Sequence, residues 1–223
     1  MRRHSGPQAQ LEAVIFDMDG VIVNSEPCHE QAFLDVVREL GCFDRLQVHY
    51  ADYVGRSDQE LWAEFAAKHK PGLTQAELLE RKTRRVVEII RRDRPVFDRV
   101  PALVEALAGR YRLALASGSV RASVEEVLAL EGLRRFFSAT ISDSEVERGK
   151  PAPDIFLCAA NLLDVAPSNC WVIEDSKPGI AAALAANMRV IAIANTHPPA
   201  ELQAATYVVS TYGEIERLLV ARA

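Results

Sequence analysis

The chain has 223 residues, a net charge of −5, 49% hydrophobic residues and 26% charged residues. These values are typical of a soluble globular protein that is long enough to bury its own core. The negative charge argues against a nucleic-acid partner, and every apolar run falls far short of the ~20 residues that a membrane span needs. We therefore expect no nucleic-acid or membrane partner, and a monomer or weak dimer.

The first ten residues and the cysteines bear on the compartment. Residues 1–10 are predicted to form a polar tail, and they lack the apolar segment of a secretory signal. A short organellar presequence is the alternative interpretation of this tail. The cysteines are scattered and show no metal-binding spacing: Cys28, Cys42, Cys158 and Cys170. A disulfide framework is not expected in a chain of this length, so we predict a reducing, cytoplasmic compartment.

Short apolar runs bounded by Gly, Pro, Asn or Asp predict buried parallel strands at 13–17, 112–117, 139–143, 170–174, 190–194 and 207–209. Helical patterns separate most of them, at 101–108, 120–130, 153–163, 177–186 and 213–221. This alternation predicts an α/β fold with a doubly wound, mostly parallel sheet and helices on both faces.

The interval 26–94 shows helical patterns only. Its first helix carries Phe33, Val36, Val37 and Leu40 ahead of a terminating Gly41, its second includes Leu61, Trp62 and Phe65, and its third follows Thr74 and Glu77. The Thr74–Glu77 spacing is that of a capping box, and the glycine is typical of a helix C-terminus. We predict a core domain at 11–25 and 95–223 and an inserted helical cap domain at 26–94.

An acidic pair, Asp17 and Asp19, follows the first predicted strand. The carboxyl ends of parallel strands are where open α/β sheets bind ligands, although such a pair can also simply end a strand in a turn. A calcium-binding EF-hand loop is excluded because Val21 and Cys28 would occupy ligand positions. Two neighbouring buried carboxylates require a cation, a lysine or both.

Three more predicted strand ends carry polar groups. Ser117 ends the second strand and either holds a phosphate or caps a helix. Lys150 lies in a loop just beyond the third, without the glycine and Ser/Thr pattern of a P-loop. Glu174 and Asp175 end the fourth, and their oxygens suit Mg²⁺, although Asp175 could equally cap the next helix. The coincidence of these groups at one edge of the sheet favours a single site.

Four segments, FDMDGV, LASGS, GKPAPDIF and VIEDSKPGI, resemble in order and spacing the motifs of the haloacid dehalogenase-like hydrolase superfamily. The resemblance runs from Leu11 to the C-terminus. The insert after the first motif resembles the helical cap of the branch that contains phosphoglycolate phosphatase, sugar-phosphate phosphatases and β-phosphoglucomutase.

The resemblance implies a role for each matching residue. Asp17 corresponds to a nucleophile that forms an aspartyl-phosphate, and Asp19 to a general acid and base. The implied phosphate-holding residues are Ser117 and Lys150, the implied Mg²⁺ ligands are Asp17, Asp19 through its backbone carbonyl, Asp175 and Glu174, and the substrate-binding set adds Gly20, Gly118 and Ser119.

The cap bears on the reaction. His29 and Lys82 resemble cap residues of the mutase, whereas Asp58 stands where the mutase has an arginine that grips a second phosphate, with Arg56 two positions away. The similar haloacid dehalogenases and phosphonoacetaldehyde hydrolases have no aspartate at the position of Asp19, so the resemblance implies that this chain acts on phosphate esters. We predict a Mg²⁺-dependent phosphatase that hydrolyses a small phosphorylated metabolite, a sugar phosphate or a similar compound, through an aspartyl-phosphate intermediate. The alternative is a β-phosphoglucomutase-like sugar phosphomutase. A second alternative, a non-catalytic metabolite-binding protein, would be expected to have lost Asp17, Asp19 or Lys150.

Overall fold

The computed structural model describes residues 11–45, 49–53 and 58–220. Within them a six-stranded sheet has the order β3-β2-β1-β4-β5-β6, and every paired strand is parallel to its neighbour. The strands are β1 (Ala13–Phe16), β2 (Arg112–Ala116), β3 (Ala139–Ile141), β4 (Cys170–Glu174), β5 (Arg189–Ile193) and β6 (Tyr207–Val209). The predicted doubly wound α/β fold is confirmed.

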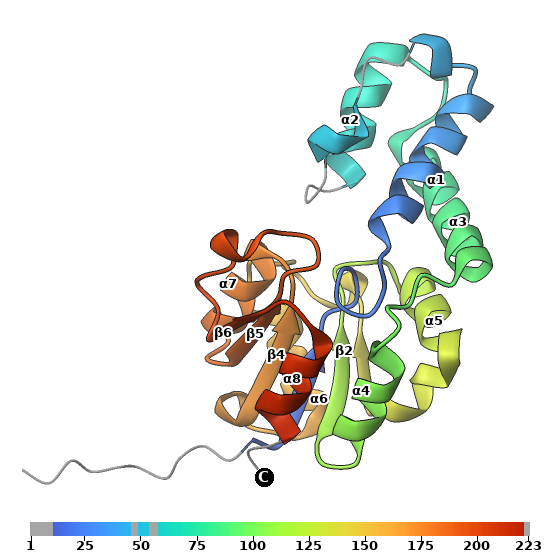
Figure 1. Ribbon diagram of the computed structural model, residues 1–223. Helices are drawn as coiled ribbons and strands as arrows, with labels where there is room; N and C mark the ends of the chain where they lie inside the picture. The colour runs from blue at the N-terminus through green and yellow to red at the C-terminus, as the bar shows by residue number, and fades with distance from the viewer. Residues whose placement is uncertain (1–10, 46–48, 54–57, 221–223) are drawn as a thin grey trace, which may run out of the picture.

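Helices cover both faces of the sheet (Figure 1). The helices that follow the cap are α4 (Val100–Ala108), α5 (Arg121–Ala129), α6 (Asp154–Leu163), α7 (Lys177–Ala185) and α8 (Tyr212–Val220). Apolar residues of α4, α5 and α8 share one buried cluster with Phe16 and Ile173. Residues of α6 and α7 form the other with Ile15 and Val172. Because alternate strand residues point to opposite faces and both faces are covered, the strands are mostly apolar, and their charged residues, Arg112, Glu174 and Arg189, stand at strand ends.

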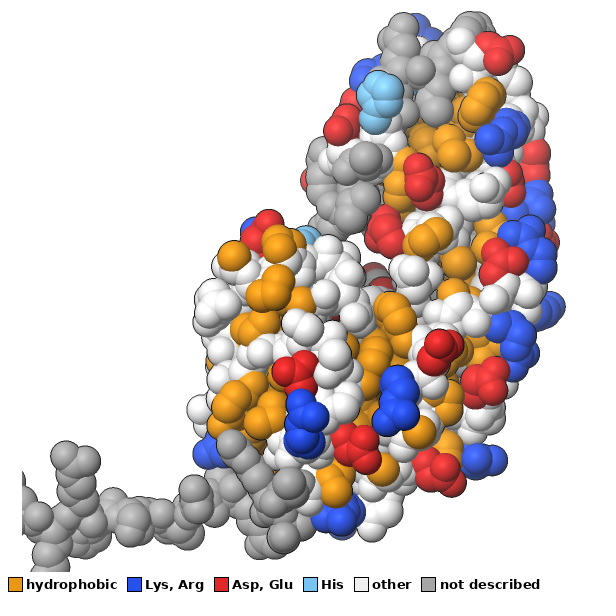
Figure 2. All heavy atoms as spheres, viewed as in Figure 1, with side chains coloured by type: hydrophobic (Ala, Val, Ile, Leu, Met, Phe, Trp, Pro, Cys, Tyr) orange, Lys and Arg blue, Asp and Glu red, His pale blue; other side chains and the backbone are white. Residues whose placement is uncertain are grey.

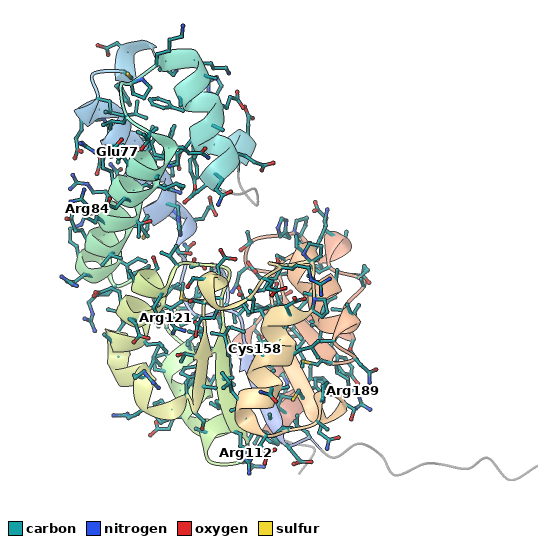
Figure 3. All side chains as sticks on the ribbon, turned by 180° about the vertical axis from the view of Figure 1, so that it is seen from behind. Glu77, Arg84, Arg112, Arg121, Cys158 and Arg189 are labelled. Carbon is teal, nitrogen blue, oxygen red and sulfur yellow. The ribbon has the colours of Figure 1, made fainter. Side chains whose placement is uncertain are left out.

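The carboxyl ends of the strands face the helical cap. Arg112 and Arg189, the first residues of β2 and β5, lie on the side of the sheet remote from the cap (Figure 3). β1 and β2 each end one residue before the predicted end, so Asp17 and Ser117 lie just beyond the regular strand. In both strands the last predicted residue therefore belongs to the ligand-binding edge of the sheet.

The insert contains α1 (Glu26–Glu39), α2 (Asp58–His69) and α3 (Gln75–Asp93), with one-turn 3₁₀ helices at Phe43–Arg45 and Tyr50–Tyr53. Its own small core centres on packed aromatic rings of Phe33, Trp62 and Phe65. Both predicted helix boundaries are confirmed. Thr74 and Glu77 form a capping box, and Gly41, with φ +65°, ends α1 through a Schellman-type pair of hydrogen bonds.

Two adjacent chain segments connect this helical layer to the sheet. The Asn24 amide donates to the Pro95 carbonyl at 2.9 Å, and the Phe97 amide donates to the Ile22 carbonyl at 3.1 Å. Val86 of α3 also belongs to the main apolar cluster, so the lower part of α3 packs on the sheet domain. We propose that the cap domain extends between these two connections, at residues 26–94.

No described helix is both long and apolar enough to cross a bilayer. The cysteines are free; Cys170 is buried within the apolar layer, and Cys158 is partly buried. Residues 1–10, the predicted polar tail, lie outside the described residues.

Candidate active site

Asp17 follows β1 directly and is 5% exposed. Its amide still continues the sheet, donating to the Ile173 carbonyl at 2.9 Å. The Lys150 ammonium donates to Asp17 Oδ1 at 2.6 Å and to Glu174 Oε1 at 2.7 Å. The loop after β3 thus brings a lysine to Asp17, one of the two carboxylates for which the sequence predicted a metal, a lysine or both, and pairs it with Glu174 rather than with Asp19.

Asp19 lies two residues further on and is surrounded by hydroxyl groups. Ser25 donates to its Oδ1 at 2.5 Å, and Ser119 and Ser117 donate to its Oδ2 at 2.7 and 3.2 Å. Ser117 also accepts a 3.0 Å hydrogen bond from the Ser119 amide. These contacts fix the orientation of the Asp19 carboxylate, and the structure places Ser117 and Ser119 beside it.

Glu174, the last residue of β4, is completely buried. Its Oε2 accepts hydrogen bonds from the amides of Asp175 and Ser176 at 2.7 and 2.6 Å and from the Ser176 hydroxyl at 2.9 Å. A Cβ at Gly179 would lie 1.6 Å from Glu174 Oε1, so the first turn of α7 can approach the carboxylate only through a glycine. Glu174 therefore organises the end of β4 and anchors Lys150.

Asp175 is held from the loop after β5. The Thr196 hydroxyl donates to Asp175 Oδ2, and Asn195 donates to the Gly20 carbonyl at 2.7 Å. Gly20 has φ +76°, and a Cβ there would lie 1.8 Å from Asp175 Oδ2. Gly20 is thus required both by its backbone conformation and by the close approach of Asp175.

Asp17, Glu174 and Asp175 each offer a carboxylate oxygen, and these atoms lie within 4.8 Å of one another. Such a set suits a hard divalent cation bound through oxygen. With Asp19, the group has four neighbouring carboxylates. Among the described residues of this group, the one cation beside them is Lys150. The donor chemistry and the excess negative charge therefore both fit a metal such as Mg²⁺.

The pKa shifts follow from this crowding. Burial raises the pKa of Asp17 well above its ordinary value, opposed by Lys150 and reinforced by Glu174 and Asp175. Burial and the Glu174 charge raise the pKa of Asp175 to about 7. Although burial disfavours its charge, Asp17 and Glu174 raise the pKa of Lys150 above its usual range. The lysine therefore stays cationic, and the carboxylates gain from a second cation.

A cavity of about 530 Å³ lies over this site, between the sheet and the cap. This volume is within the range of about 300–1,000 Å³ that is typical of small-molecule sites. Its lower wall includes Asp17, Asp19, Gly20 and Lys150, and Gly118 and Ser119 also line it. The surface is hollowed where the two parts of the molecule meet (Figure 2).

The cap supplies the upper wall. His29, Tyr50 and Asp58 line the cavity, whereas Lys82 lies behind them, with 1% of its side chain exposed. The Lys82 ammonium donates to Asp58 Oδ1 and lies 3.4 Å from His29 Nδ1. Of the predicted cap residues, His29 thus lines the cavity and Lys82 does not, while Arg56 lies outside the described residues.

The profile of the haloacid dehalogenase-like hydrolases matches residues 11–187, which carry the whole cluster of Asp17, Asp19, Lys150 and Asp175. This chain belongs to that family. The expectation drawn from the four sequence motifs is confirmed.

Relatives of this hydrolase include two enzymes of Escherichia coli strain K12. Hexitol phosphatase B is 35% identical over 191 residues, which is 82% of this chain and 84% of the relative. Fructose-1-phosphate phosphatase YqaB is 34% identical over 186 residues, 80% of this chain and 94% of the relative. Among solved structures, β-phosphoglucomutase from Clostridium difficile superposes with a TM-score of 0.78 at 25% identity and covers 96% of each chain.

Three side chains that position the acidic cluster and Gly20 were not among the predicted site residues of this hydrolase: Ser25, Asn195 and Thr196. Asn195 and Thr196 follow the predicted fifth strand, so the rule that polar residues cluster at strand ends could have found them. Ser25 immediately precedes α1 but makes no capping hydrogen bond with its side chain. Its side chain turns to Asp19 instead, which only the tertiary structure shows.

Proposed function

We propose that this protein is a Mg²⁺-dependent phosphatase that hydrolyses a phosphate monoester of a small sugar or polyol through an aspartyl-phosphate intermediate. One observation carries the proposal. A buried Asp17 paired with Lys150 and an Asp19 held by three hydroxyl groups line one cavity together with Asp175. The phosphatases among the relatives support the same reaction.

In the first step, an Asp17 carboxylate oxygen attacks the phosphorus atom, and the bond from phosphorus to the ester oxygen breaks. Asp19 donates a proton to the departing oxygen, which leaves as an alcohol. In the second step, Asp19 takes a proton from water as the water oxygen attacks phosphorus. The bond to Asp17 breaks, and inorganic phosphate leaves with Asp17 restored.

Charge compensation provides most of the remaining catalysis in phosphoryl transfer. Lys150, which contacts Asp17 Oδ1, would bind a phosphate oxygen beside the nucleophile. Gly118 and Ser119 line the same wall. Ser117, predicted to hold the phosphate, does not line it: its side chain is buried, and its hydroxyl donates to Asp19 Oδ2. Mg²⁺ would be held by Asp17, Asp175 and the Asp19 carbonyl, and when bound it would neutralise charge on the transferring phosphoryl group.

A sugar phosphomutase is the second candidate, favoured by the similarity to β-phosphoglucomutase and by His29 and Lys82 in the cap. A mutase must also bind the second phosphate of a bisphosphorylated intermediate. In this chain the buried Lys82 is already paired with Asp58, and Asp58 presents a carboxylate to the cavity. This arrangement favours hydrolysis.

The test is a screen of phosphorylated metabolites for release of inorganic phosphate. We expect activity with Mg²⁺, complete loss with EDTA, and recovery when Mg²⁺ is added back. Ca²⁺, which is larger and prefers more ligands, should restore little activity. Full activity in the presence of chelator would overturn the metal assignment, and no phosphate release from any compound would overturn the proposed reaction.

A further inference from the structure

The cap wall of the cavity contains an ion pair of unequal exposure. The side chain of Lys82 is 1% exposed, whereas that of Asp58 is 38% exposed. Lys82 also lies between His29 Nδ1 at 3.4 Å and the Tyr50 ring, whose centroid is 5.5 Å away. The lysine is therefore enclosed by the cap, and its charge fixes one oxygen of Asp58.

The other oxygen of that carboxylate is the part available to a ligand. Lys82 contacts Oδ1, and no described residue donates a hydrogen bond to Oδ2. Asp58 begins α2 and lines the same cavity as Asp17 and Lys150. A carboxylate that one lysine orients, and that receives no second donor from the described residues, is a well-oriented acceptor for a hydroxyl group.

A second carboxylate on this wall has the same character. Glu26, the first residue of α1, lines the cavity. It accepts a hydrogen bond from the Tyr50 hydroxyl, and its Oε1 is buried without a partner in the described part of the chain. Buried acceptors without a partner are uncommon in folded proteins, so Glu26 adds a second carboxylate with an unused acceptor to this wall.

The charges of the wall oppose a second phosphate. Among the described residues that form it, the carboxylates Asp58 and Glu26 face one ammonium, that of Lys82. Burial and the Lys82 charge lower the pKa of His29, so the imidazole is neutral near pH 7. The described part of the upper wall is thus rich in hydrogen-bond acceptors and carries a net negative charge, whereas the lower wall has Lys150.

We propose that Asp58, held by Lys82, is a specificity-determining residue that accepts a hydrogen bond from a hydroxyl group of the substrate. The substrates are then monophosphates of uncharged, polyhydroxylated compounds, and bisphosphates are disfavoured. The phosphate occupies the Asp17 and Lys150 end of the cavity, and the hydroxylated end reaches the cap. This inference rests on the proposed phosphatase activity.

The test compares three compounds with the full chain and Mg²⁺: sorbitol 6-phosphate, p-nitrophenyl phosphate, which has no hydroxyl groups beyond its phosphate, and fructose 1,6-bisphosphate. In Asp58→Asn, the ratio of kcat/KM for sorbitol 6-phosphate to that for p-nitrophenyl phosphate should fall about tenfold or more, since a charged acceptor is lost. The ratio for the bisphosphate relative to sorbitol 6-phosphate should rise. Glu64→Gln, an equal charge change on the exposed side of α2, should leave both ratios unchanged.

Asp58→Asn leaves the Lys82 charge buried without its partner, which can prevent folding. The double variant Asp58→Asn with Lys82→Met removes both charges and should show the same change in the ratios. An equal loss on sorbitol 6-phosphate and p-nitrophenyl phosphate would show a purely structural role and overturn the inference, as would unchanged ratios in a folded variant. No hydrolysis of any of the three compounds by the natural chain would instead overturn the proposed phosphatase.

Discussion

Asp17 occupies a position where function and stability oppose each other. Its pKa is raised because burial and the neighbouring acids disfavour its charged form. We therefore expect Asp17→Asn to lower turnover by about 1,000-fold or more, because the nucleophile is lost, without lowering the melting temperature measured in EDTA. Lys150 keeps its contact with Glu174 in this variant. Turnover above a tenth of the natural value would contradict the nucleophile assignment.

Substitutions at Gly20 and Gly41 distinguish the cost of backbone strain from the cost of crowding by neighbouring side chains. Both have positive φ, but a Cβ at Gly20 would collide with Asp175, whereas nothing lies within 4 Å of one at Gly41. Gly41→Ala should lower the free energy of unfolding by about 1 kcal/mol through strain alone. Gly20→Ala should cost more and also weaken Mg²⁺ binding, because Asp175 must move. Denaturant unfolding and calorimetric Mg²⁺ titration measure both effects, and equal costs would contradict the crowding argument.

At the scale of the element, α1 links the site to the cap. It follows Ser25, which holds Asp19, and carries His29 near its start, next to Lys82 of α3. Burial and Lys82 lower the pKa of His29, while Asp19, Asp58 and Glu26 oppose this shift. The imidazole therefore binds a proton less readily in the folded chain than in the unfolded chain.

The lowered pKa of His29 makes the stability of the folded chain depend on pH. Above about pH 6.5 both states hold neutral His29, and its contribution to stability is intact. As the pH falls below 6.5 toward the lower folded pKa, the unfolded chain takes up the proton first, so the natural protein loses stability. Relative to His29→Gln, we expect it to lose up to about 1 kcal/mol between pH 7.5 and 5.5 in metal-free denaturant unfolding. A difference that does not change with pH would contradict the shift.

At the scale of the whole molecule, the sheet and cap together decide between hydrolysis and mutase chemistry. The two layers enclose one cavity with Lys150 below and Asp58 above. With β-glucose 1-phosphate and a trace of the 1,6-bisphosphate, we expect inorganic phosphate and no isomerisation. Glucose 6-phosphate forming much faster than phosphate would show that Arg56 or Lys82 binds the second phosphate and would establish the mutase.

Local sequence patterns were sufficient to predict the positions of the strands and two of the helix ends in the cap. Apolar runs between Gly, Pro, Asn and Asp located all six described strands to within two residues at each end, because the interior of a strand buried on both faces favours apolar side chains. Capping chemistry located the start of α3 and the end of α1 for an equally local reason. Helix ends must satisfy their free amides and carbonyls with nearby groups.

The sequence by itself determined the fold class and, through the edge rule for parallel sheets, the neighbourhood of Asp17, Asp19, Lys150 and Asp175. The tertiary structure alone decided which side chains hold these groups in place. Thr196 contacts Asp175 from the loop after β5, and Ser25 contacts Asp19 from the start of α1. Lys82 of α3 contacts Asp58 of α2. Contacts of this kind depend on how helices and loops pack together, and no local periodicity records them. Substrate selection belongs to this second group, because it depends on which groups the cap turns toward the cavity.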